Sequence, residues 1–235
     1  EYGKLLVGKT ILSSKGYGMF VDFYLSGNVI MNIGDGVSAR YYNPGDKVPA
    51  NYQLLLTFKD ESFLVFTVAM YGFISAYPDA VIDNKYYTIS RESISPLSDA
   101  YTEAEFGKLF ASAKKTLTAK ALLATEQRIP GVGNGVTQDI LFNAGIHPKQ
   151  KVFDLSDGQK GVLFKSLKDT LMAMTSGRGR DTQTDLYGNE GGYKTILSSK
   201  TWKNPCPRCG SVIVKEAYLG GSVYYCSECQ KIRKT

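Results

Sequence analysis

Four cysteines near the end of the sequence form two Cys-x-x-Cys pairs, Cys206 with Cys209 and Cys226 with Cys229, separated by sixteen residues. Each short pair can offer two thiolates to one ion, and zinc prefers this tetrahedral sulfur environment. Because four thiolates leave no open coordination position, the sequence predicts a structural zinc site. Two disulfides are the alternative, but the first 205 residues contain no cysteine and the sequence as given shows no secretory signal.

Two β-rich segments lie between the cysteine pairs. Residues 210–215 and 223–225 are rich in Val, Ile and Tyr, and Gly220 and Gly221 stand between them. Strand-forming segments that flank a Gly-Gly turn predict a β-hairpin. Residues 201–235 are therefore expected to form a zinc-binding β-hairpin, a four-Cys zinc finger.

Positive charge is concentrated in the later parts of the sequence. Residues 200–235 hold seven Lys and Arg against two acidic residues, and residues 111–151 hold six against two. Residues 1–110, by contrast, hold nine basic residues against twelve acidic ones. A basic face beside a zinc hairpin indicates a polyanionic partner, most simply nucleic acid, although ordinary solvated lysines would give the same count.

Composition places the chain among soluble proteins with more than one compact unit. It has 235 residues, of which 43% are hydrophobic, and no run of about 18 apolar residues that would span a membrane. Free thiolates suit a reducing compartment. We therefore expect a cytoplasmic, nucleoid-associated monomer that does not contact a membrane.

The first 95 residues are predicted to form a β-sandwich or a barrel. Apolar and β-branched residues fill two pairs of segments that each flank a polar turn, 19–25 with 29–33 and 53–58 with 63–68. Residues 71–77 predict a further strand, whereas the Pro, Ser and Asp residues of 78–99 predict a linker.

Between residues 100 and 200 the hydrophobic period becomes that of helices. Thr102 with Glu105 and Ser156 with Gln159 have the spacing of capping boxes that begin helices. Two shorter helices are predicted between them, over 117–126 and 135–143. Residues 176–192 are rich in Gly, Arg and Asp without periodicity, which predicts a long loop that is either functional or disordered.

A glycine-rich turn, Gly131-Val-Gly133-Asn134, separates two of these helices. Free N–H groups at the beginning of a helix, together with the helix dipole, bind phosphate. Asn134 would either cap the new helix or donate to the same phosphate. The turn is therefore a predicted phosphate site, although a plain glycine turn with an N-cap Asn has the same sequence.

The order of these features resembles the formamidopyrimidine-DNA glycosylase / endonuclease VIII family. The resemblance is most specific in residues 127–148, which hold the Gly-x-Gly-Asn turn, and in residues 205–230, which hold the four cysteines. It implies an α+β protein of several domains. These would be an N-terminal β-sandwich, a helix-two-turn-helix DNA-binding domain and the zinc hairpin, over 1–95, 100–200 and 201–235.

The resemblance implies base-excision repair of damaged double-stranded DNA. Family members extrude an oxidised purine or pyrimidine, cleave its N-glycosidic bond and nick the abasic strand by elimination, after a secondary amine attacks C1′. The protein would then be a DNA glycosylase, a hydrolase, with AP lyase activity. A non-catalytic protein that recognises damaged DNA with the same fold is the alternative.

The residues that the family uses for catalysis are only partly matched. Its N-terminal proline nucleophile and the Glu that follows align ahead of residue 1, so the sequence as given is expected to lack this pair. Lys15 matches the lysine of the family's first hairpin, one position out of register. A surface lysine at the start of a strand is the alternative for Lys15.

The loops that contact DNA in the family also differ here. Met70 and Tyr71 occupy a loop that enters the duplex in the family, and they would fill the space left by an extruded base. A turn with one buried aromatic residue is the alternative. In the zinc hairpin, Gly221 and Ser222 stand where the family has a phosphate-binding arginine, so backbone N–H groups are expected to meet the phosphate there.

Overall fold

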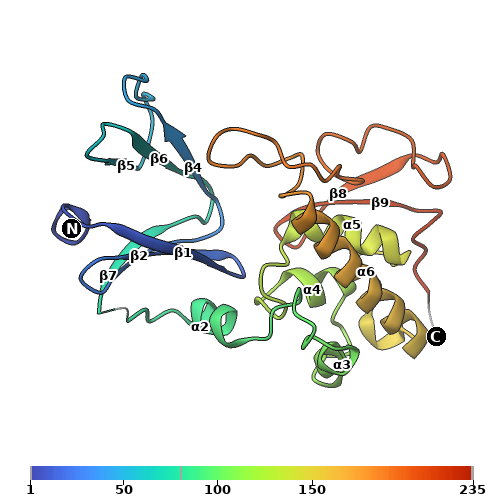
Figure 1. Ribbon diagram of the computed structural model, residues 1–235. Helices are drawn as coiled ribbons and strands as arrows, with labels where there is room; N and C mark the ends of the chain where they lie inside the picture. The colour runs from blue at the N-terminus through green and yellow to red at the C-terminus, as the bar shows by residue number, and fades with distance from the viewer. Residues whose placement is uncertain (1, 80, 234–235) are drawn as a thin grey trace. The chain divides into compact units, whose positions relative to one another are not determined.

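The computed structural model describes residues 2–79 and 81–233, which divide into two compact units (Figure 1). The first, here called the strand unit, comprises Glu1–Glu92 and Thr184–Glu190. The second, the helix unit, comprises Ser93–Gln183 and Gly191–Thr235. The long loop predicted over 176–192 therefore contributes its tip to one unit and its two stems to the other.

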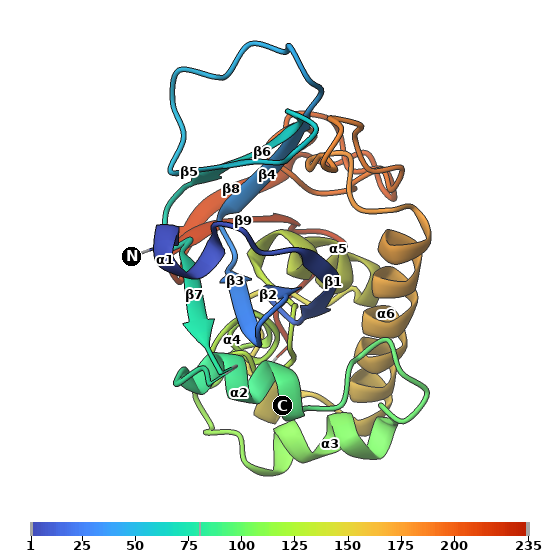
Figure 2. The same cartoon turned by 60° about the vertical axis from the view of Figure 1, so that its left-hand side comes forward.

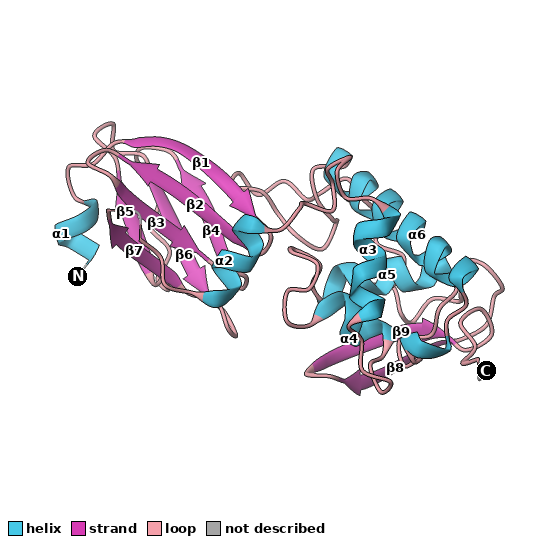
Figure 3. Cartoon of the chain, turned by 90° about the horizontal axis from the view of Figure 1, so that it is seen from below, coloured by secondary structure: helices cyan, strands magenta, loops and turns pink. Residues whose placement is uncertain are grey.

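The strand unit is a sandwich of two antiparallel sheets (Figure 3). The larger sheet has the order β1-β2-β3-β7, with the strands Ile11–Tyr17, Phe20–Leu25, Val29–Ile33 and Ile74–Pro78. The smaller sheet has the order β4-β6-β5, with the strands Val37–Tyr42, Phe63–Val68 and Leu54–Thr57. Apolar residues of both sheets, including Met31 and Phe66, share one core. The two predicted hairpins, β2–β3 and β5–β6, are confirmed.

Two helices accompany the sheets, α1 (Tyr2–Leu6) and α2 (Lys85–Glu92). Helix α2 lies within the segment predicted as a linker, so that prediction is corrected. The Asn84 side chain accepts hydrogen bonds from the N–H groups of Tyr86 and Tyr87 and so begins the helix. The Tyr87 hydroxyl then donates to the buried carboxylate of Asp22 at 2.6 Å, which fixes α2 on the larger sheet.

The helix unit holds four α-helices, a 3-10 turn and a β-hairpin in its described residues, and α6 is its longest helix (Figure 2). In chain order they are α3 (Glu103–Ala111), α4 (Ala119–Ala124), α5 (Asn134–Ala144), the 3-10 turn (Val152–Asp154), α6 (Asp157–Ser176), β8 (Ile213–Tyr218) and β9 (Gly221–Cys226).

Both predicted helix starts are observed in the helix unit. Thr102 accepts from the Glu105 N–H at the start of α3, and Ser156 and Gln159 form a capping box at the start of α6. Gly145, with φ 65°, ends α5 in the left-handed conformation that glycine adopts without strain.

Helix α5 lies at the centre of the helix unit. Its Ile140 packs with Leu122 of α4 and Leu163 of α6, and all three side chains are fully buried. A second cluster, around Phe142, joins α5 to the β8–β9 hairpin. No helix in the described parts of the chain combines the length and the apolar character needed to cross a bilayer.

Candidate metal centre and nucleic-acid interface

The four cysteines meet at the base of the β8–β9 hairpin. The Sγ atoms of Cys206 and Cys229 are 3.8 Å apart, those of Cys209 and Cys226 are 3.4 Å apart, and all four lie within 4.8 Å of one another. A tetrahedral zinc ion with Zn–S bonds of about 2.3 Å separates its sulfur ligands by about 3.8 Å, so these residues fit the ion.

The thiols are free, because the Sγ separations far exceed the disulfide bond length of about 2.05 Å. Hydrogen bonds from Ser211 lower the pKa of the Cys209 thiol to about 6, whereas burial raises the pKa of the Cys226 thiol and raises that of Cys229 to about 12. In the part of the chain that the structure describes, this is the one cluster of His, Cys, Asp or Glu side chains arranged to hold a metal.

The hairpin is bound to α5 through the buried side chain of Gln138. Its Nε2 donates to the Ser222 carbonyl at 3.0 Å, and its Oε1 accepts from the Tyr224 N–H at 3.1 Å. The Gln138 amide thus makes the donor and acceptor contacts with the β9 backbone that a neighbouring strand would make. Strand β9 runs alongside α5 (Figure 1). On the far side of the hairpin base, Gln230 bridges the Cys226 N–H and the Ile146 carbonyl.

A buried lysine holds the other end of the hairpin. Lys120, on α4, is 2% exposed, and its ammonium donates to the Tyr218 carbonyl immediately before the hairpin turn. Burial lowers the pKa of Lys120, since removal from water disfavours its charged form. The Leu219–Ser222 turn is therefore held from both sides, by Lys120 on α4 and by Gln138 on α5.

The predicted phosphate turn lies at the beginning of α5. Gly131 has φ 82°, a left-handed conformation that suits glycine, and Val132 is buried in the core. Gly133 occupies the N-cap without a side-chain cap, and the first turn of α5 contains no acidic residue. The first N–H groups of the helix have no intrahelical acceptor, so they and the dipole favour an anion here.

Asn134 connects this turn to the hairpin. It is the first residue of α5 and not its N-cap, so the capping alternative is corrected. Its Nδ2 donates to the Ser222 carbonyl at 3.1 Å, and a side chain at Gly221 would approach that nitrogen to 3.2 Å. The structure thus brings together Gly131, Gly133 and Asn134 with Gly221 and Ser222, two segments about ninety residues apart in the sequence.

In the strand unit, Met70 and Tyr71 form the tip of a tight turn. Their side chains are 88% and 89% exposed, so the buried-aromatic alternative is wrong for Tyr71. The turn closes with the Gly72 N–H on the Ala69 carbonyl, and Met70 has φ 52°, which is uncommon for a residue with a side chain.

Two glycines let this turn pack directly on neighbouring backbone. A Cβ at Gly36 would lie 2.4 Å from the Ala69 carbonyl oxygen, and one at Gly72 would lie 2.7 Å from the Gly36 carbonyl carbon. The tip is therefore rigidly supported while its two large apolar side chains are displayed to solvent. The tip therefore presents two adjacent large side chains that a partner can cover.

Lys15 lies on β1, where it pairs with Asp22 of β2. Its side chain is exposed, and its ammonium lies 5.1 Å from the centre of the Tyr17 ring. The Arg91 guanidinium lies 5.4 Å from the same ring. Lys15 is thus a surface residue, as its alternative expects, but it lies near the end of β1 (Ile11–Tyr17) and not at its start. The aromatic ring that it shares with Arg91 has no signal in the sequence.

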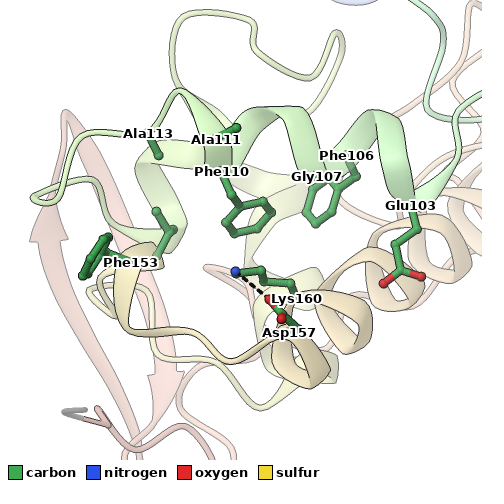
Figure 4. Close-up of a pocket in the computed structure, with 10 residues that line it drawn as sticks. Glu103, Phe106, Gly107, Phe110, Ala111, Ala113, Phe153, Asp157 and Lys160 are labelled. Atoms are coloured by element: carbon green, nitrogen blue, oxygen red, sulfur yellow. Dashed lines mark hydrogen bonds and ion pairs between the residues drawn. The ribbon is translucent and has the colours of Figure 1, made fainter.

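The helix unit also has a surface groove of about 570 Å³, shown in Figure 4. Phe106, Phe110 and Phe153 line it, and its Lys160–Asp157 ion pair at 2.9 Å joins residues three apart on α6. Such a pair stabilises its own helix. The residues that line the groove do not include those of the junction between α5 and the hairpin.

The sequence analysis missed the residues that position the interface. Gln138 and Lys120 hold the hairpin on α5 and α4, yet neither belongs to a motif. One signal was available: both are polar residues inside otherwise apolar helix faces, where a buried polar group requires a partner. Their partners lie more than eighty residues away, so the sequence does not name them.

Proteins similar in sequence to this chain are named formamidopyrimidine-DNA glycosylases. No family model matches the chain. A formamidopyrimidine-DNA glycosylase of Mycoplasma mobile is 28% identical over 244 residues, which cover 99% of this chain and 85% of that protein. The same name belongs to a relative from Brevibacillus brevis, 26% identical over 98% of this chain and 84% of its own length.

Solved structures share the fold over nearly the whole chain. The MutM (Fpg) protein of Thermus thermophilus superimposes with a TM-score of 0.79 at 23% identity, covering 98% of this chain and 86% of its own. Lactococcus lactis Fpg, in a complex with DNA that contains an abasic site, superimposes with a TM-score of 0.80 at 22% identity, covering 97% and 84%.

Proposed function

We propose, from the premise that the chain is a homologue of the formamidopyrimidine-DNA glycosylases, that it is a DNA base-excision-repair enzyme. In this role it binds damaged duplex DNA, removes an oxidised base as an N-glycosylase and nicks the resulting abasic strand as a lyase. The observation that carries the proposal is the junction in the helix unit where the Asn134 amide joins the start of α5 to the Ser222 carbonyl of the hairpin.

This junction is suited to the phosphate backbone of DNA. Gly131 and Gly133 place no side chain in front of the first N–H groups of α5, and the side-chain position of Gly133 is open space. On the hairpin, Gly221 and Ser222 expose a second stretch of backbone beside Asn134. Contacts of this kind fix the position of a duplex without reading its sequence.

We assign the Met70–Tyr71 tip to the duplex itself. Extruding a base leaves a gap in the stack and costs a few kcal/mol, and an inserted apolar side chain offsets part of that cost. Met70 and Tyr71 are large, apolar and almost fully exposed on a supported turn, which is the arrangement that insertion requires.

The reaction requires an amine next to the sugar. Its nitrogen bonds to C1′ while the bond from C1′ to the damaged base breaks and the base leaves with a proton. The C1′–O4′ bond then breaks, with a proton going to O4′, which opens the sugar ring and gives the imine. Loss of a proton from C2′ of this imine expels the 3′ phosphate. The family's amine and carboxylate for these steps align ahead of residue 1, and we assign Lys15 as the residue of this sequence that supports them at the sugar.

We also propose that Cys206, Cys209, Cys226 and Cys229 hold a structural zinc ion. The bound ion supplies a cross-link at the base of the hairpin, and four thiolates leave it no position for a substrate. The rest of the hairpin then presents its turn to the DNA. Free thiolates and a DNA substrate suit the cytoplasm, where the protein would work on the nucleoid.

The test is borohydride trapping on a duplex with an abasic site, using the protein with whatever residues precede residue 1 in its gene. Borohydride reduces the imine to a stable amine, so an enzyme gives a covalent protein–DNA band. Lys15→Ala should slow formation of the band without lowering zinc content. Tight binding to the abasic duplex with no trapped band would support the non-catalytic DNA-binding protein instead, and absence of binding would refute both.

A further inference from the structure

The guanidinium of Arg180 rests on the first turn of α5. A Cβ at Gly135, the second residue of that helix, would lie 2.2 Å from Nη1 of Arg180 and 3.0 Å from its Cζ. Contacts this short do not occur, so the guanidinium occupies the space in which any other residue at position 135 would place its side chain. Gly135 directly follows Asn134, whose amide holds the hairpin turn.

The backbone of Arg180 is fixed by the returning stem of its own loop. Arg180 forms a bridge with Tyr193, the Asp181 N–H donates to the Tyr193 carbonyl at 2.9 Å, and the Tyr193 N–H donates to the Gly179 carbonyl at 3.0 Å. Gly191 permits this pairing, since a Cβ there would lie 2.6 Å from the Arg180 nitrogen. The loop that lacks periodicity in the sequence is therefore ordered at the point that carries Arg180.

Asp139, one turn along α5 from Gly135, holds the same stem against the helix. Its fully buried carboxylate accepts from the N–H groups of Ile196 and Leu197, at 3.0 and 2.8 Å, and from the Tyr193 side chain. Burial raises the pKa of Asp139, and these donors and the positive charge of Arg180 oppose that rise. Asp139 thus positions the stem that positions Arg180.

The guanidinium of Arg180 lies at the beginning of α5, where its charge also acts on the buried Asp139 carboxylate. The beginning of a helix carries a positive partial charge, and the first turn of α5 contains no acidic residue. An anion bound there would be attracted by the helix dipole and by the guanidinium together. The neighbouring hairpin turn, Leu219–Ser222, contributes no basic side chain.

We propose that Arg180 is a phosphate-binding residue of the DNA interface and that it supplies the cation which the hairpin turn of this protein lacks. The proposal rests on the proposed function, because the phosphate is that of a DNA duplex. Arg180 would donate to the phosphate that meets the N–H groups of α5, and Gly135 leaves room for the guanidinium in this position. A guanidinium can offer two parallel donors to such a phosphate.

The test compares three variants for binding to a short duplex that carries an abasic-site analogue, over a series of salt concentrations. Arg180→Ala removes the guanidinium. Gly135→Ala keeps every charge, and Ala favours a helix more than Gly does, but its methyl group displaces the guanidinium. Arg178→Asn is the matched control, since Arg178 is an exposed residue of the same loop and Asn tolerates its left-handed φ of 55°.

Arg180→Ala should weaken binding by about tenfold and reduce the slope of log affinity against log salt by about 0.9, the value for one phosphate. Gly135→Ala should weaken binding similarly while its melting temperature stays level or rises, which a purely structural role would not produce. Arg178→Asn should have a clearly smaller effect.

The inference is overturned if Gly135→Ala binds as the wild type does, or if Arg180→Ala loses no more affinity than Arg178→Asn. Should Arg180→Ala unfold, Gly135→Ala alone decides. If the wild-type protein does not bind duplex DNA, the proposed function has failed and this inference fails with it. Wild-type binding with unchanged variants refutes the role of Arg180 alone.

Discussion

Replacing Gln138 with Ala should weaken the docking of the β8–β9 hairpin on α5. The change removes the acceptor of the Tyr224 N–H, which lies in a strand that is buried at this point, and the donor to the Ser222 carbonyl. An unpaired buried N–H costs about 1–3 kcal/mol, and the second lost hydrogen bond adds about 0.5–1.5 kcal/mol. Because Asn134 continues to donate to Ser222, we expect a total loss of about 2–4 kcal/mol in the free energy of unfolding of the helix unit.

Trp202 makes this loss measurable. It is the single tryptophan of the sequence, and it packs against the cluster that joins Phe142 of α5 to the hairpin. Its fluorescence during urea unfolding of the zinc-loaded protein therefore reports hairpin docking. Gln138→Glu is the matched variant: it keeps an acceptor for Tyr224 but sets a buried carboxylate oxygen against the Ser222 carbonyl, so it should lose at least as much stability as Gln138→Ala. Asn134→Ala removes the hydrogen bonds of its side chain with Ser222 and Gln138 but no N-cap, and should cost about 1 kcal/mol. A Gln138→Ala variant within about 0.5 kcal/mol of the wild type would refute the reasoning.

Removing zinc with a chelator, or the change Cys226→Ser, should abolish DNA binding while the strand unit keeps its β-sheet circular dichroism, because thiolate ligation supplies the folding free energy of the hairpin. Full affinity without zinc would contradict this. Met70→Ala with Tyr71→Ala should weaken binding to abasic duplex more than to intact duplex and leave the melting temperature unchanged, since both side chains are exposed. An equal loss on both duplexes would exclude insertion. Hydrogen bonds from the Ser62 hydroxyl and N–H lower the pKa of Asp60 below its usual value of 3.8, so they stabilise the β5–β6 turn above that pH and are lost as the pH falls through the lowered pKa. Carboxyl NMR titration should show this low pKa and its rise in Ser62→Ala; no rise would disprove the assignment.

The features that the sequence predicted are those fixed by neighbouring residues. The cysteine spacing, the caps at Thr102 and Ser156 and the two hairpins of the sandwich each depend on residues within about twenty positions of one another. Such local patterns carry their own physical requirement, for example the orphan N–H groups that a cap satisfies.

The features that it did not predict depend on contacts between distant segments. Strand β4 is an exception: it was missed although its sequence alternates, with Val37, Ala39 and Tyr41 packed against the core of the sandwich. Helix α2 follows a proline and is anchored by the contact of Tyr87 with Asp22, sixty-five residues earlier. Asn134 was expected as a possible N-cap of α5, but Gly133 is the N-cap. The Asn134 amide instead donates to the distant Ser222 carbonyl.

Gly135 and Arg180 are each unfavourable when considered alone. Glycine inside a helix costs about 1 kcal/mol relative to alanine, and a cation near the beginning of a helix is repelled by the dipole. Each becomes understandable through the other, since the missing side chain of Gly135 is what allows the guanidinium to lie on the helix. Both penalties are offset when a phosphate enters, because it is attracted by the dipole and by the guanidinium at once. On this reasoning, the cation beside the hairpin comes from Arg180 of the 176–192 loop. The glycines at 220 and 221 leave the hairpin turn free to approach the same DNA backbone.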